Sequence, residues 1–153
     1  MRLRTLKASM MLLVVFALIA ISTRGVATAP PMPLPNPVLN FLGQEPYSTG
    51  GKDFIRYKYE VTNFDAYPKD LFAPAPALPP CGTNTKSART WVDILDSRGK
   101  RLYGFCALGN PKDLNGIYFS LESDVVPPSY VYIELTDRQT STKYKSNLAD
   151  TTL

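Results

Sequence analysis

Apolar and polar residues alternate through most of this chain, and the alternation predicts β-strands. The stretch FIRYKYEVTN is the clearest case, because Ile55, Tyr57, Tyr59 and Val61 alternate with charged residues. This period is typical of antiparallel strands with one buried and one solvated face. Six further strands are expected, at residues 38–42, 89–96, 100–108, 117–122, 130–137 and 143–147.

Residues 89–108 are interpreted as a β-hairpin whose turn can be assigned. Ser97, Arg98 and Gly99 suit a three-residue loop, in which a type I turn is followed by a left-handed residue that glycine adopts without steric cost. The predicted register pairs Leu95 with Arg101, Ile94 with Leu102, Asp93 with Tyr103, Val92 with Gly104, Trp91 with Phe105 and Thr90 with Cys106.

That register divides the hairpin into two faces. The face expected to point into the core holds Val92, Ile94, Leu102 and Cys106. The opposite face holds three aromatic side chains and one acid, Trp91, Tyr103, Phe105 and Asp93. Three exposed rings on one face require either a cover or a ligand.

The N-terminus has the three-part layout of a secretory signal peptide. Basic residues precede an apolar run over residues 10–21, and small residues follow. The run is about a dozen residues long, whereas a membrane-spanning helix needs about 20. We therefore expect a signal helix at residues 1–27, cleaved after Ala27, and a periplasmic or secreted chain. The alternative is an uncleaved signal that anchors the chain in the inner membrane.

The charge balance argues against nucleic acid as a partner. Four of the 17 basic residues precede the expected cleavage site, and the remaining 13 match the 13 acidic residues. Nucleic-acid binding needs a concentrated basic face, whereas these charges are interspersed in sign. The chain also lacks histidine, which removes Ser-His and Cys-His nucleophile systems and nearly all zinc sites. We expect no metal site and no cofactor.

The two cysteines, Cys81 and Cys106, are expected to form a disulfide, as is usual in exported chains. The bridge would close a loop of about 24 intervening residues, which corresponds to about 3 kcal/mol of stability in the chain-entropy model. It would also attach the end of a proline-rich insert, residues 64–88, to the hairpin.

We expect the insert to lie as a lid across Trp91, Tyr103 and Phe105, because it carries apolar groups of its own and segments this long are seldom unstructured in compact domains. Two interpretations stay open. The lid and rings form a second core, or the rings form a binding platform for sugar rings or peptides with the lid as its rim.

The stretch VPPSYVYIELTDRQTSTKYKSN resembles the last two strands of fibronectin type III and related immunoglobulin-like domains. The resemblance and the strand spacing predict an all-β fold, a two-sheet antiparallel immunoglobulin-like sandwich of about seven strands. Trp91 departs from the pattern, since those domains usually carry their core tryptophan one strand earlier. The block from YEVTN to FCAL is similar to small exported bacterial proteins of unassigned function, a resemblance that implies export and indicates no particular activity.

The sandwich is expected over residues 38–148. A stiff proline-rich linker should precede it at residues 28–37, and a frayed tail should follow at residues 149–153. We expect a non-enzymatic binding or structural module that serves an envelope or extracellular protein or glycan. The alternatives are a carbohydrate- or peptide-binding module that uses the aromatic platform, a carboxylate-based hydrolase, and pairing of an exposed edge strand with another protein.

Overall fold

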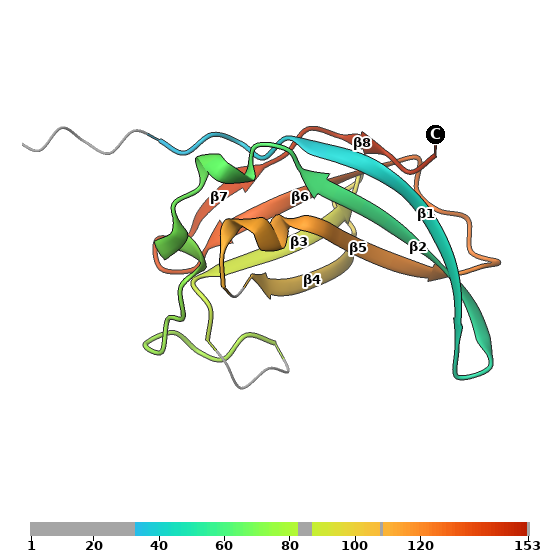
Figure 1. Cartoon of the computed structure of the whole chain (residues 1–153), viewed down its shortest axis with the longest axis horizontal. Coiled ribbons are helices and arrows are strands. Elements are labelled where there is room, and N and C mark those ends of the chain that lie inside the picture. Colours follow the sequence, from blue (N-terminus) through green and yellow to red (C-terminus); the bar gives the residue numbers. More distant parts are fainter. Residues whose placement is uncertain (1–32, 83–86, 108, 153) are drawn as a thin grey trace, which may run out of the picture. The chain divides into compact units, whose positions relative to one another are not determined.

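The computed structural model describes residues 33–82, 87–107 and 109–152, and these form two antiparallel sheets around one core (Figure 1). The predicted signal peptide lies outside the described residues. The first sheet has the order β1-β2-β5, with β1 (Leu39–Thr49), β2 (Lys52–Val61) and β5 (Asn115–Glu122). The second has the order β4-β3-β6-β7, with β3 (Thr90–Asp96), β4 (Arg101–Ala107), β6 (Tyr130–Asp137), β7 (Thr142–Lys145) and, paired with β6, β8 (Ala149–Asp150). The prediction of an all-β, two-sheet fold is confirmed.

The core contains the side chains that the alternation predicted. Tyr57 and Tyr59 of β2 are buried, and the Tyr57 ring stacks on Phe119 of β5 with centroids 4.9 Å apart. From the other sheet, Val92 and Ile94 of β3 are fully buried in the same cluster. In both sheets every second side chain is buried, so that the apolar face of one sheet packs against the apolar face of the other.

The first strand is longer than predicted. A strand was expected at residues 38–42 and a turn from Pro46 onward, but β1 continues to Thr49 and is bulged between Phe41 and Gly43. Proline is tolerated there because β1 lies at the edge of its sheet, where a missing N–H breaks no ladder bond. The turn is confined to Gly50 and Gly51, which both have positive φ.

The expectation that residues 149–153 fray is wrong for the described residues up to 152. Ala149 pairs with Val131 of β6, and Thr151 is fully buried. The carbonyl oxygen of Thr151 also accepts a 2.8 Å hydrogen bond from Gln44 Nε2 of β1. These contacts hold the tail between β6 of the second sheet and β1 of the first.

The described end of the predicted linker, residues 33–37, is attached to the domain. Tyr67 donates a 2.8 Å hydrogen bond to the carbonyl oxygen of Pro35, and Asn63 Nδ2 donates one of 3.0 Å to that of Asn36. Burial of the Tyr67 phenol raises its pKa. Part of the proline-rich segment therefore belongs to the packed structure.

The predicted β3–β4 register is correct only next to the turn. Gly99 is left-handed, with φ of 84°, and Leu95 pairs with Arg101 as predicted. A bulge at Leu102 then shifts all the remaining pairs by one residue, so that Val92 faces Phe105. The observed pairs are Ile94 with Tyr103, Asp93 with Gly104, Val92 with Phe105, Trp91 with Cys106 and Thr90 with Ala107. The prediction failed because it assumed a ladder without an extra residue.

The start of β3 is held by a buried ion pair. Arg89 Nε and Nη2 lie 3.0 and 2.9 Å from the two carboxylate oxygens of Asp137, whose side chain is 4% exposed. Gln139 N–H and the Thr140 hydroxyl also donate to this carboxylate. The hydrogen bonds from Arg89, above all, lower the pKa of Asp137. The pair therefore fastens β3 to the turn after β6.

Replacing Asp137 by Asn is expected to lower the free energy of unfolding by about 2 kcal/mol at neutral pH, because Arg89 would remain partly buried without its carboxylate. Since the folded pKa lies below its ordinary value of 3.8, the stabilisation should be complete above about pH 4 and lost as the pH falls through the folded pKa. Urea unfolding at neutral pH and near pH 2 checks this: the difference in the free energy of unfolding between the variant and the parent should be smaller near pH 2. The control is Asp70→Asn, since this second partner of Arg89 is 71% exposed. Equal losses at both pH values would contradict the assignment.

Candidate functional site

The four predicted binding residues do not share one surface. Trp91 and Asp93 alternate with the buried Val92 and therefore point outward from the second sheet. Phe105 pairs with Val92 and packs against the core. Tyr103, two residues earlier, lies on the same side of β4 as Phe105, with ring centroids 6.1 Å apart. The predicted platform is split by the sheet itself.

Trp91 is covered by its own neighbours. The Arg101 guanidinium lies 4.8 Å from the centre of the indole ring and forms an ion pair with Asp93, with Nε 2.7 Å from Oδ1. A side chain at Gly104 would collide with that guanidinium, so glycine leaves it room to lie flat on the sheet. Gly82 lies against the indole from the insert. These contacts favour a structural interpretation of Trp91.

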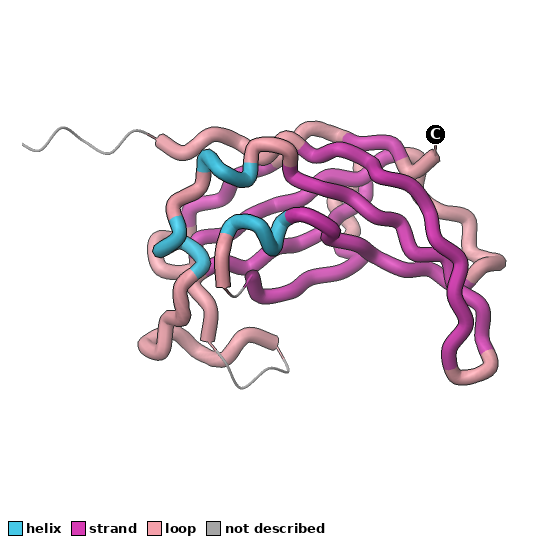
Figure 2. The backbone as a smooth tube through the Cα atoms, in the orientation of Figure 1, coloured by secondary structure: helices cyan, strands magenta, loops and turns pink. Residues whose placement is uncertain are grey.

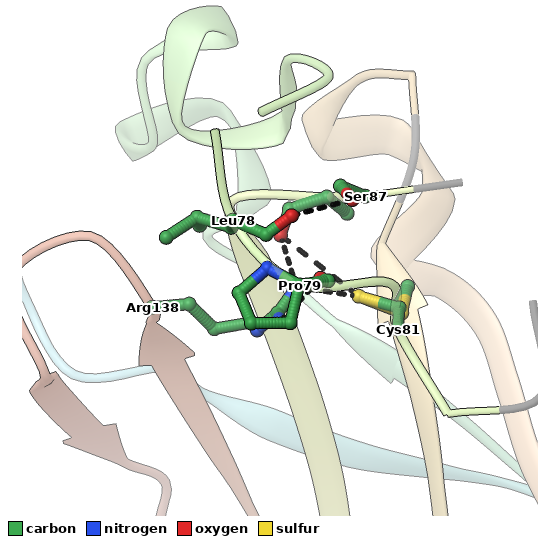
Figure 3. Close-up of a disulfide and its surroundings, with 7 residues drawn as sticks. Leu78, Pro79, Cys81, Ser87 and Arg138 are labelled. Atoms are coloured by element: carbon green, nitrogen blue, oxygen red, sulfur yellow. Dashed lines mark hydrogen bonds between the residues drawn. A yellow bond between two sulfur atoms is a disulfide. The ribbon is translucent and has the colours of Figure 1, made fainter. Parts of the chain in front are cut away.

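The disulfide between Cys81 and Cys106 is confirmed, with the two Cα atoms 6.0 Å apart. Figure 3 shows Arg138 beside the bridge, where its Nη2 donates a 2.8 Å hydrogen bond to the carbonyl oxygen of Pro79. Arg138 Nη1 donates one of 2.7 Å to that of Ala88. The second half of the insert is therefore fastened covalently and by hydrogen bonds to the outer side of the second sheet.

The first half of the insert is part of the main core. Tyr67, Leu71 and Phe72 are buried in the same cluster as the sheets. They follow or belong to two 3₁₀ turns, η1 (Phe64–Ala66) and η2 (Lys69–Phe72), which lie with a third, η3 (Pro111–Leu114), at one end of the sandwich (Figure 2). The insert closes that end of the core. It does not lie across Trp91, Tyr103 and Phe105 together, because these rings face different sides of the sheet.

A different set of rings forms a continuous surface, which we call the tyrosine–arginine stripe and define as Tyr47, Arg56, Tyr118 and Tyr103. Arg56 Cζ lies 4.7 Å from the ring centre of Tyr47 and 4.6 Å from that of Tyr118. Tyr118 stacks on Tyr103 with centroids 6.4 Å apart. Tyr118 is 42% and Tyr103 47% exposed. The stripe crosses the outer face of the first sheet and ends on β4 of the second.

Strand geometry positions these side chains. Tyr118 points outward because its neighbours Ile117 and Phe119 are buried. Arg56 lies between the two rings on the central strand, and its Nη1 is 3.7 Å from Glu45 Oε2. Sequence reasoning missed Tyr47 because it lay in a predicted turn. The outward position of Tyr118 could have been predicted, because it lies between two residues of IYFSLE that were expected to point inward.

A cavity of about 510 Å³ lies beyond the end of β5, between the β3–β4 turn and the β5–β6 loop. Leu102, Leu121 and Val126 supply apolar walls, and Val126 is 87% exposed. Arg98 and Lys100 also line the cavity. Asp96 lines it as well, so the hollow combines apolar walls with charged side chains of both signs.

Two carboxylates of the second sheet lie opposite each other on neighbouring strands. Asp93 and Glu134 are opposite each other on β3 and β6, but each faces a cation, Arg101 at 2.7 Å and Lys143 at 2.6 Å respectively. Hydrogen bonding to Glu134 raises the pKa of Lys143.

In the part of the chain that the structure describes, no three side chains of the metal-binding types come together. The same part contains no helix of the length and apolarity needed to span a membrane.

Replacing both cysteines with serine is expected to lower the free energy of unfolding by about 3 kcal/mol, because the unfolded chain regains the freedom of the closed loop. The sheets should survive, since the core lies apart from the bridge. Chemical denaturation followed by Trp91 fluorescence checks this, with the reduced parent as the matched control. A double variant as stable as the oxidised parent would contradict a stabilising bridge.

Replacing Trp91 with Ala is expected to cost about 2 kcal/mol of stability, because the indole loses its contacts with Gly82 and Arg101. Thermal unfolding of this variant beside Trp91→Phe, which keeps an aromatic ring, measures the effect. An unchanged melting temperature with lost ligand binding would restore Trp91 as a binding residue.

No protein-family model matches the chain, and no curated protein or solved structure shows significant similarity to it.

Proposed function

We propose that this chain is an exported, non-enzymatic binding module of the cell envelope or the extracellular space. The N-terminal charge and hydropathy pattern supports export. The Cys81–Cys106 bridge supports it independently, because disulfides persist mainly in oxidising compartments.

The proposal includes an immunoglobulin-like fold, close to that of fibronectin type III domains. If the first seven strands are lettered A, B, C, C′, E, F and G, the sheets become A-B-E and C′-C-F-G. In both sheets a strand pairs with one far along the chain, β2 with β5 and β3 with β6, as Greek-key connections require. This order supports the resemblance of residues 126–147 to the last two strands of such domains.

The observation that carries a binding role is the tyrosine–arginine stripe. Tyr103 and Tyr118 are large apolar rings left exposed on rigid strands. Exposed apolar groups that adjoin one another mark interaction sites more often than hydrophobic residues that are exposed singly. Stacked rings beside a planar cation suit flat, partly apolar ligands, such as sugar rings or extended peptides. Glu45, Asp93 and Glu134 each lie within ion-pair distance of a cation, which favours binding over hydrolysis at these positions.

Replacing Tyr118 with Ala is expected to weaken ligand binding about tenfold, because one stacking contact in the middle of the stripe is lost. The full chain, purified from an exporting host, would be tested on immobilised envelope polysaccharides and on immobilised envelope proteins. The control is Leu148→Ala, since Leu148 is also exposed but lies outside the stripe. Equal retention of both variants, with unchanged thermal stability, would overturn the stripe as the binding surface.

A further inference from the structure

β5 forms an open edge of the first sheet, and its free backbone groups can be identified. The Ser123 N–H donates to the carbonyl oxygen of Asp53 at 2.9 Å, in register with the β2–β5 ladder. Bonded pairs recur at every second residue of an antiparallel ladder, so Phe119 also bonds to β2. The N–H and C=O groups of Tyr118 and Ser120 therefore point away from β2. Among the described residues, no hydrogen bond of the backbone uses them.

The other three edges carry features that oppose strand addition. β1 contains Pro46, and Asn147 occupies both backbone groups of Leu39, with hydrogen bonds of 2.8 and 3.0 Å. β7 is four residues long and includes two lysines. β4 is bulged at Leu102 and begins with Arg101. Charge, proline, bulges and short length are the usual means by which edges avoid pairing.

The β5 sequence lacks most of these features. Asn115–Glu122 contains neither proline nor a basic residue, and its one acid, Glu122, comes last. Eight residues give an edge of ordinary strand length. The irregular step opposite Tyr59 and Glu60 lies at its first residues, so the part from Ile117 onward is regular.

The surroundings of this edge fit the side chains of one added strand. Successive side chains of such a strand point to opposite faces. Beside this edge they would meet the stacked rings of Tyr118 and Tyr103, whose centroids are 6.4 Å apart and which are both about half exposed. Past Leu121 the strand would reach the 510 Å³ cavity, whose walls include Leu102 and Leu121.

From this arrangement we propose that β5 binds an extended peptide segment of a partner protein as an additional antiparallel strand. The inference rests on the proposed function, since it names the ligand class of the same stripe. Main-chain hydrogen bonds to Tyr118 and Ser120 provide affinity, and the two rings and the cavity select apolar side chains at alternate positions. Because an antiparallel peptide runs opposite to β5, the cavity receives a side chain from its N-terminal half.

Two other occupants fit less well. A glycan has no alternating N–H and C=O groups to match those of the open edge. A second copy paired through β5 would bring its own β4 and its own Tyr103 to the interface. Two half-exposed tyrosines would then compete for the space that one side chain of a single strand fills.

The experiment uses a displayed library of random nine-residue peptides, with an array of oligosaccharides in parallel, against the full exported chain. Selected peptides are titrated against Ser120→Pro, which removes an outward N–H without removing a bond to β2, and against its matched control Ser120→Ala, which keeps the N–H. We expect Ser120→Ala to bind like the parent and Ser120→Pro to bind at least tenfold more weakly. Circular dichroism and thermal unfolding verify that both variants are folded.

A second measurement leaves the protein unchanged and therefore decides the matter even if Ser120→Pro does not fold. N-methylation of the selected peptide at every second residue should abolish binding in one of the two frames and spare it in the other. Equal tolerance of both frames, full binding by folded Ser120→Pro, or β5-dependent self-association in sedimentation would each overturn strand addition. If the chain binds only oligosaccharides, and Tyr118→Ala abolishes that binding, strand addition is overturned while the proposed function stands. Binding of neither class would overturn both.

Discussion

The bulge at Leu102 determines which side chains of β4 reach each side of the sandwich. Side chains of a strand alternate, so one extra residue exchanges the two faces from that point onward. The shift turns Phe105 toward the core and Cys106 outward beside Trp91. The outward cysteine in turn requires the insert to cross the outer surface of the second sheet, and Tyr103 comes to lie where it can stack on Tyr118.

The insert has two roles that its composition does not separate. Its first half supplies Leu71 and Phe72 to the core and closes one end of the sandwich. Its second half contributes little apolar surface and is instead fixed by the disulfide and by hydrogen bonds from Arg138. Prolines help in both halves, because they reduce the conformational entropy that the unfolded chain would otherwise lose. The described parts of the insert are thereby attached to the sandwich, while the candidate site rests on strands.

Much of the fold could be predicted from the sequence, whereas the residues of the candidate site could not. The alternation in FIRYKYEVTN and YVYIELTD identified the strands and their buried residues, and the turn at Gly99 was assigned correctly. The aromatic face expected on the hairpin is split between two sides of the sheet, and the tyrosine–arginine stripe is a different surface. Its members differ, since Trp91 lies on another face and Tyr47, Arg56 and Tyr118 come from strands far from the hairpin in sequence.

The sequence by itself determined most of the strands, the apolar faces of β2, β3 and β6, and that two cysteines in a chain with a signal-like N-terminus pair. These properties depend on residues close in sequence, or on a choice with only one outcome. Only the tertiary structure decided the register of β4, the stacking of Tyr103 on Tyr118 and the exposure of the β5 edge. Each of these depends on how two sheets pack and on one unpaired residue. Neither the packing of the sheets nor the position of a bulge can be predicted from the alternation of apolar and polar residues, because that alternation is the same before and after a bulge.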